Sequence, residues 1–257
     1  MNLLNTVRAE TVKLFTTRSV WWTSALFVLL SFGISLLLTV TPQQPLGLFV
    51  FQIQPYTVVY GIPSIGLPVL IVQAVMVVTT EYRYRIQATA YLASPRRWTV
   101  PVAKLLVYGI YAAALTFLTA LLCLVVAKVR VGDDALIYSM GDPDVLRILW
   151  VLPLATFLVV CFSQGVGLLL RHTAGAVALL LAWILALEDI VAFLPKIGER
   201  IGDWLPFRHL NNFIAGGGPA GGATGLDWTQ GASLAYFVLW AAGLFLIGVG
   251  VLYKRDV

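Results

Sequence analysis

The sequence predicts an all-α integral membrane protein with six transmembrane helices. Its composition is 60% hydrophobic and only 11% charged, whereas soluble domains average about 45–50% apolar and about 25% charged residues. The apolar residues gather in six runs, and each is close to the roughly 20 residues that a helix needs to cross a bilayer. We therefore expect residues 1–257 to form a single transmembrane domain.

Polar or glycine-rich connections separate the six apolar runs. We expect spans over residues 20–40, 62–80, 101–127, 149–170, 173–193 and 232–252, with a charge-free loop over residues 41–61 and a long outer loop between the last two spans. The connection at Arg171 and His172 is so short that the fourth and fifth spans must be adjacent and antiparallel. Gly165 and Gly167 in the fourth span and Gly175 in the fifth are expected to let these two helices approach closely.

An amphipathic helix over residues 2–17 is predicted before the first span. Its apolar face comprises Leu3, Leu4, Val7, Leu14 and Phe15. Arg8, Glu10 and Lys13 fall elsewhere on the same helix. This pattern favours a helix lying in the membrane interface, and the alternative is an ordinary polar lead-in that happens to be helical.

The charge distribution predicts the orientation of the spans. Six spans place both termini on one side, where eleven basic and three acidic residues give a net charge of +8, and the other side carries six basic and nine acidic residues. By the positive-inside rule both termini are expected in the cytoplasm. The formal charge of +5 therefore reports orientation and does not indicate binding to nucleic acid. The few lysines and abundant alanine, valine, leucine and glycine are typical of a bacterium with a GC-rich genome.

The sequence lacks the patterns that catalysis would require. None of its lysines follows a glycine, so the phosphate-binding loop that ends in Gly-Lys-Ser/Thr is absent. His172 and His209 are expected on opposite sides of the membrane and cannot share a metal ion. We accordingly predict no catalytic residue, no metal ligand and no cofactor bound by this chain.

Glu188 and Asp189 form the only acidic pair inside an otherwise apolar run. A charged group at the bilayer centre costs at least about 2.5 kcal/mol, which suggests a role in a substrate pathway. The preceding run of apolar residues, however, places the pair near the outer interface. The alternative is therefore a solvated helix end.

The connection between the second and third spans carries an ordered set of motifs. Glu81, Tyr82 and Arg83 end the second span, and Lys104 enters the third, near enough to its end to snorkel. Between them lie a predicted short helix that begins at Ile86 and ends at Leu92, and then Pro95, Arg96 and Arg97. This arrangement resembles the permease subunits of type-2 ABC transporters (ABC-2 permeases). The resemblance extends to the amphipathic start, the six-span plan and Leu205-Pro206-Phe207 in the outer loop.

The resemblance implies a permease that pairs with a separate ATP-binding subunit. Two such subunits, which hold ATP and Mg²⁺, would act with two permease chains, either two copies of this chain or this chain with a related permease. Residues 86–92 would form the coupling helix that docks on the ATPase, with Glu81, Arg83, Arg96 and Arg97 in polar contacts around it. The usual direction is export, here across a bacterial plasma membrane. The other interpretation of the basic cluster is simple positive-inside anchoring.

A second hypothesis is an ATP-independent membrane protein, either a secondary carrier or a scaffold for membrane assembly. Many secondary carriers are built from two repeated halves, and no convincing repeat relates residues 1–128 to residues 129–257. The sequence does not predict the substrate.

Overall fold

The computed structural model describes residues 3–40, 54–84, 98–131, 139–194, 201–216, 226 and 228–254. Every element in these ranges is helical, and six helical segments are long and apolar enough to cross a membrane. The prediction of an α-helical, multi-pass membrane protein is confirmed at this level.

The six spanning segments follow the predicted order, and most are longer than expected. They are α2 (Arg18–Val40), α3 to α4 (Pro55–Val59 and Leu67–Arg83, joined through the π-helical turn η1, Ile62–Gly66), α6 (Thr99–Val131), α7 (Pro143–Leu170), α8 to α9 (Thr173–Ala182 and Glu188–Phe193, joined through the π-helical turn η2, Trp183–Leu187) and α12 (Gln230–Lys254). The largest extension is in the second span. The fourth span begins six residues before its predicted start, and the other bounds lie within four residues of the prediction.

The helix α3 covers Pro55–Val59, which corrects the predicted loop over residues 41–61. Pro55 opens α3 at a position where its missing amide hydrogen costs nothing, and the π-helical turn η1 (Ile62–Gly66) leads directly into α4. Val58 and Val59 are fully buried. Apolar packing therefore continues the second span beyond its predicted start, and residues 41–53 lie outside the described ranges.

The central helix of the bundle is α7, which packs against α4, α6, α8, α11 and α12. Within the chain, 61% of its most apolar window is buried, compared with 17% for the segment Thr173–Val191. The fifth span therefore turns most of its surface outward, where lipid or another chain would cover it.

Glycines allow a close approach in this bundle, although at a different pair of helices from the predicted one. A Cβ atom on Gly165 would lie 2.7 Å from the Phe245 backbone nitrogen, and one on Gly248 would lie 2.9 Å from Leu168 Cβ. Both contacts join α7 to α12. Gly167 instead faces α4 near Val75 and Thr79, and Gly175 faces its own His172. The expectation that these glycines serve the fourth and fifth spans is therefore wrong.

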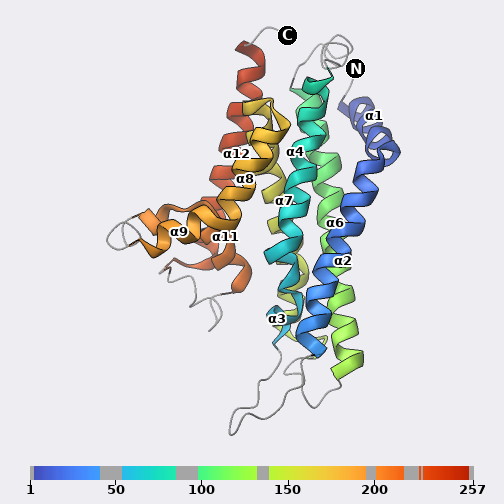
Figure 1. Ribbon diagram of the computed structural model, residues 1–257, viewed down its shortest axis with the longest axis vertical. Helices are drawn as coiled ribbons and strands as arrows, with labels where there is room; N and C mark the ends of the chain where they lie inside the picture. The colour runs from blue at the N-terminus through green and yellow to red at the C-terminus, as the bar shows by residue number, and fades with distance from the viewer. Residues whose placement is uncertain are drawn as a thin grey trace.

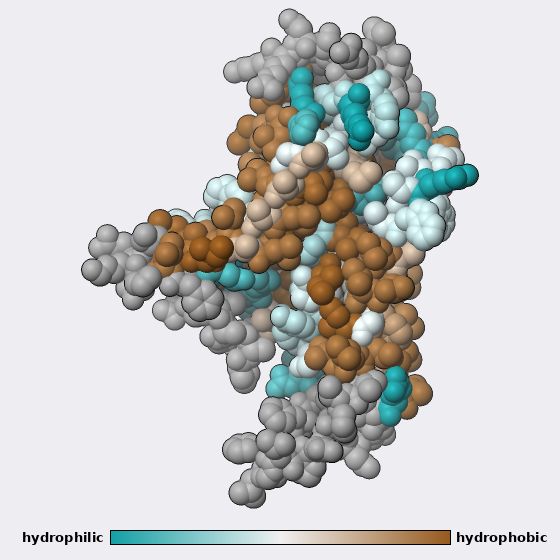
Figure 2. Space-filling view, in the orientation of Figure 1, coloured by the Kyte–Doolittle hydropathy of each residue, from teal (hydrophilic) through white to brown (hydrophobic). Residues whose placement is uncertain are grey.

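The amphipathic helix α1 (Leu3–Thr16) and the last turns of α12 lie at the same end of the bundle (Figure 1), which we call the terminal end. The ends of α4 and the start of α6 also lie there. Figure 2 shows apolar side chains over much of the middle of the bundle, and hydrophilic ones mostly towards its ends, with a smaller hydrophilic area at mid-height. This distribution is the one that a bilayer requires of a multi-pass protein.

The connection between the last two spans contains ordered helices. The short 3-10 helix η3 (Gly202–Trp204) precedes α11 (Pro206–Ala215). Figure 1 shows that the fifth segment bends after α8, so that α9, and also α11, lie across the direction of the other spans, partway along the bundle. Pro206 begins α11, and Gly216 ends it in the left-handed conformation with φ of 83°. Residues 217–225 of the glycine-rich tract lie outside the described ranges.

Candidate functional site

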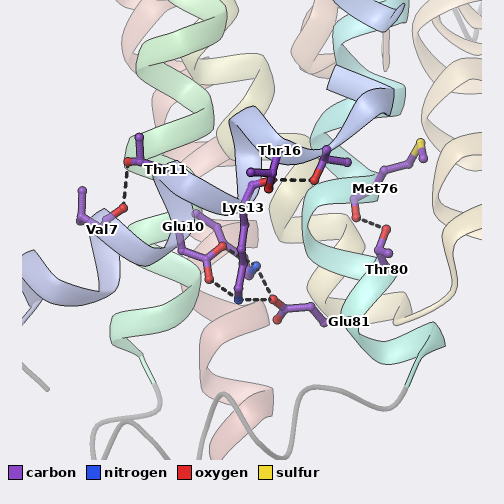
Figure 3. A network of polar contacts seen from close by, with 10 residues as sticks. Val7, Glu10, Thr11, Lys13, Thr16, Met76, Thr80 and Glu81 are labelled. Atoms are coloured by element: carbon purple, nitrogen blue, oxygen red, sulfur yellow. Dashed lines mark hydrogen bonds and ion pairs between the residues drawn. The ribbon is translucent and has the colours of Figure 1, made fainter. Parts of the chain in front are cut away.

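Four charged side chains meet at the terminal end, where α1, α4 and α6 come together. Lys104 Nζ lies 2.7 Å from Glu10 Oε2 and 2.8 Å from Glu81 Oε1. Lys13 Nζ lies 2.8 Å from Glu10 Oε1 and 3.0 Å from Glu81 Oε1. Figure 3 shows Glu10, Lys13 and Glu81 pointing towards one another. We call these four residues the charged junction.

The members of the charged junction differ in their exposure. The side chains of Lys104 and Glu10 are only 6% and 7% exposed, that of Glu81 is 17% exposed, and that of Lys13 is 51% exposed. Two carboxylates and two ammonium groups balance, so the buried charges are compensated within the junction. Burial acts to lower the pKa of Lys13, but the hydrogen bonds and charges of Glu10 and Glu81 outweigh it and raise that pKa above its usual value.

The structure corrects the expected position of Lys104. A snorkelling lysine would extend towards water, but the Lys104 ammonium is enclosed between carboxylates from two other helices. Glu10 likewise faces inward, onto α6, whereas the sequence placed it only away from the apolar face of α1. Both corrections have one cause, because each residue provides the counter-charge that lets the other be buried.

The predicted apolar face of α1 is divided between the chain and the outside. Leu14 is buried, and Leu3 and Val7 are partly buried. Leu4 and Phe15 are 74% and 44% exposed, as expected of residues that would touch lipid. Thus the inward face of α1 includes the charged residue Glu10, which pairs with Lys104. Part of the apolar face of α1 is exposed at the surface of the chain.

Two members of the charged junction flank the predicted coupling segment, with Glu81 before it and Lys104 after it. Glu81, Tyr82 and Arg83 form the last turn of α4, directly before residues 85–97, and α6 begins at Thr99 directly after them. The Arg171 guanidinium lies 5.1 Å from the centre of the Tyr82 ring. Five of the predicted coupling residues lie outside the described ranges: Ile86, Leu92, Pro95, Arg96 and Arg97. The ion pair of Lys104 with Glu81 therefore joins the helix that leads into this segment to the helix that leaves it.

Glu188 and Asp189 have separate surroundings. The carboxylate of Glu188 is buried and accepts hydrogen bonds from Trp183 Nε1 at 2.7 Å, from the Phe207 amide at 3.0 Å and from the Arg208 amide at 2.7 Å. Both amides belong to the first turn of α11, which has no partner for them within its own helix. Asp189 is exposed. The structure therefore does not bring this pair together as one acidic site.

A basic residue holds the opposite end of α11. The guanidinium of Arg147, on α7, donates to the carbonyl oxygens of Phe213 and Ile214 in the last turn of α11, and to Gln230 Oε1 of α12. An acid at the amino end and a base at the carboxyl end both complement the helix dipole. The short helix α11 is thus fixed by charges from the fourth and fifth spans, far from the charged junction (Figure 1).

Sequence reasoning missed four of these residues as site members: Glu10, Lys13, Lys104 and Arg147. Their signals were present. Lys104 is a cation inside an apolar run, and such a residue requires a counter-charge from another segment. Glu10 and Lys13 are charges on the predicted interfacial helix, and Arg147 lies just before the predicted start of the fourth span. The pairing itself depends on the tertiary arrangement and cannot be obtained from spacing along the chain.

The two histidines have separate structural partners. His172 accepts a hydrogen bond from the Gly175 amide at 2.9 Å and caps α8. His209 is buried in α11 beside Ser233 and the Asp203 carbonyl. No group of three or more histidine, cysteine, aspartate or glutamate side chains within the described ranges is placed to hold a metal ion.

The helices and their apolar surfaces define an α-helical, multi-pass membrane protein. No protein-family model matches the sequence, and no curated protein matches it.

Proposed function

We propose that this chain is the membrane-spanning permease subunit of an ABC-2-type exporter and acts with a separate ATP-binding subunit. The observation that carries the proposal is the position of the charged junction. It joins α1, the end of α4 and the start of α6, which flank the segment that resembles the coupling region of these permeases.

This arrangement suits the transmission of force from a soluble partner. A subunit that pushes on residues 85–97 would act on two helix ends that are already tied together by the bond of Lys104 to Glu81, 2.8 Å long. Because Lys104 also binds Glu10, α1 would move with them. ATP would drive the change to the extent that it binds one conformation of the assembly better than the other.

The proposed assembly contains two copies of the ATP-binding subunit, which hold ATP and Mg²⁺, and two permease chains in membrane lipid. The second permease is another copy of this chain or a related one. We place the complex in a bacterial plasma membrane, with both termini in the cytoplasm, and assign no catalytic residue to this chain. The poorly buried surface of the fifth span offers area for contact with the second permease.

We assign Glu188 to the anchoring of α11 rather than to a substrate pathway. All of its contacts given above are donors from Trp183 and the first turn of α11. The charged groups of the junction lie at helix ends, and the carboxylate of Glu188, although buried partway along the bundle, is occupied by donors of its own chain. Both arrangements differ from the charged substrate or ion site near the midplane that is typical of a secondary carrier.

Affinity purification from native membranes tests the proposal. The tagged chain is extracted in mild detergent, and proteins recovered at stoichiometric yield are identified. We expect a soluble protein with a phosphate-binding loop ending in Gly-Lys-Ser/Thr. Recovery of the folded chain without any nucleotide-binding protein, under conditions that preserve its own fold, would instead favour an ATP-independent carrier or scaffold.

A further inference from the structure

A cavity of about 320 Å³ lies beside the charged junction, between α1, α2, α4 and α6. One stripe of α4 forms its floor: Gln73, Met76, Val77, Thr80 and Glu81. These positions recur at three and four residues, so they lie on one face of the helix. Glu81 follows Gln73 by eight positions, which corresponds to about 12 Å along the helix axis.

The end of the cavity near Glu81 is charged and has unused bonding capacity. Both lysines of the junction bond Oε1 of Glu81, and Oε2 makes no bond to another described residue. Lys13 is half exposed, so its ammonium has room to bind a further anion. The four junction charges already balance, and a guest with no net charge would keep them balanced.

The deep end of the cavity is formed by an amide whose bonding is poor. Gln73 is only 2% exposed, yet the hydrogen bonds that its amide accepts from Thr23 and donates to Ser19 are both 3.4 Å long. Good hydrogen bonds of this kind are about 2.9 Å long. A buried amide with weak partners is expensive, and a guest with an acceptor oxygen at this depth would satisfy it. The intervening walls, which include Val20 and Val107, are apolar.

The cavity opens where lipid head groups would lie. Thr16 and Thr17, at the junction of α1 with α2, are exposed and line it. Trp21 and Trp22 follow in the next turn and are 57% and 77% exposed, and tryptophan gathers at the membrane interface. The opening of the cavity therefore lies at the depth of lipid head groups, in the leaflet that surrounds the terminal end.

We propose that this cavity binds a phospholipid with a primary amine in its head group, such as phosphatidylethanolamine. The ammonium group donates to Glu81 Oε2, the phosphate accepts from Lys13, and an ester carbonyl reaches the amide of Gln73. The glycerol backbone lies along the Val77 stripe. A choline head group has no N–H to donate, and an anionic glycerol head group would leave the site with an excess negative charge. The proposal does not depend on the transport function proposed above.

Native mass spectrometry of the purified chain with phosphatidylethanolamine, phosphatidylcholine and phosphatidylglycerol at equal concentrations tests this site. We expect the ethanolamine lipid to be retained about tenfold more strongly than the choline lipid, as one charge-assisted hydrogen bond would give. Equal retention of the three lipids, or a preference for phosphatidylglycerol, would overturn the proposal.

Two variants connect the lipid to this cavity. Val77→Trp fills it and should abolish the selective retention, whereas Val125→Trp, on an exposed part of α6, should not. If Glu81→Gln folds, it should retain the ethanolamine and choline lipids equally. If it does not fold, the Val77→Trp variant still tests whether the lipid binds in this cavity. Selective retention that survives Val77→Trp would place the lipid elsewhere.

Discussion

Lys104 Nζ lies 2.7 Å from Glu10 Oε2, although 94 positions separate the two residues in the sequence. This contact fixes the amphipathic helix α1 onto α6, and the bond from Lys104 to Glu81 adds α4. The start of the chain and the two helices around residues 85–97 are thereby joined in one unit.

Removal of Lys104 should destabilise the protein far more than removal of Lys13. Both lysines contact Glu10 and Glu81, but their side chains are 6% and 51% exposed. Lys104→Met leaves buried carboxylates without their main counter-charge, which costs about 3–5 kcal/mol. Lys13→Met removes a half-exposed pair worth about 0–1 kcal/mol. The free energy of unfolding in detergent, measured for both variants, checks this difference.

A double variant provides the control for that comparison. Glu10→Gln in the Lys104→Met background removes one of the stranded charges, so it should restore part of the lost stability. A coupling energy of about 0.5–3 kcal/mol is expected for residues in one network. If the two lysine variants lost equal, small amounts of stability, the charged junction would not hold α1 in place.

Reversal of the two arginines in the coupling segment should weaken binding of the ATP-binding subunit. Arg96→Glu with Arg97→Glu places two acids where the proposal expects a docking surface, and both residues lie outside the spans, so membrane insertion should be retained. Co-purification of the partner measures the effect. The matched control is Lys128→Glu with Arg130→Glu at the opposite end of α6, which should leave the partner bound. Normal recovery with the arginine variant would refute this assignment.

Glu188→Gln should destabilise the protein, and Asp189→Asn should not. The glutamine has only one oxygen to accept from the two amides of α11 and from Trp183, and each buried donor left without a partner costs about 1–3 kcal/mol. Asp189 is exposed. Thermal unfolding of the two variants provides the comparison. A Glu188→Gln protein of normal stability with altered transport would return Glu188 to a pathway role.

His209 should make the protein less stable as the pH falls below neutrality. Burial lowers the pKa of this imidazole below its usual value, which is about 6.5. The unfolded chain therefore binds a proton more readily than the folded one, so the stabilisation is complete above that usual value and is lost at lower pH. Unfolding measured from pH 7 to pH 5 should show this loss, and His209→Gln should reduce the slope. An unchanged slope in the variant would assign the effect to other groups.

The spans could be predicted from sequence because their signal is local. Runs of about 20 apolar residues and the positions of charges between them depend on the bilayer rather than on particular neighbours. The helix α3 was missed because the charge-free stretch over residues 41–61 contains Pro and Gln residues, which are typical of a loop. It is stabilised by the burial of Val58 and Val59, which only the packed bundle reveals.

The charge pairs were harder to predict because they join distant segments. Glu188 was recognised as costly in an apolar run, but its partners are backbone amides of α11, and amides carry no signal in the sequence. Lys104 was interpreted as a snorkelling lysine because its position near a helix end permits that. A lysine at such a position is exposed to water or buried according to whether carboxylates from other helices reach its ammonium group. Here Glu10 and Glu81 both reach Lys104, so it is buried.

The most direct test of the permease assignment is a photo-crosslinking amino acid placed at Leu92 in the coupling segment of the chain in native membranes. Val129, which is 80% exposed at the opposite end of α6, provides the control position. We predict that the probe at position 92 crosslinks to a protein with a Gly-Lys-Ser/Thr phosphate-binding loop, and that the probe at position 129 does not. A folded chain whose probe at position 92 captures no nucleotide-binding protein would contradict the assignment.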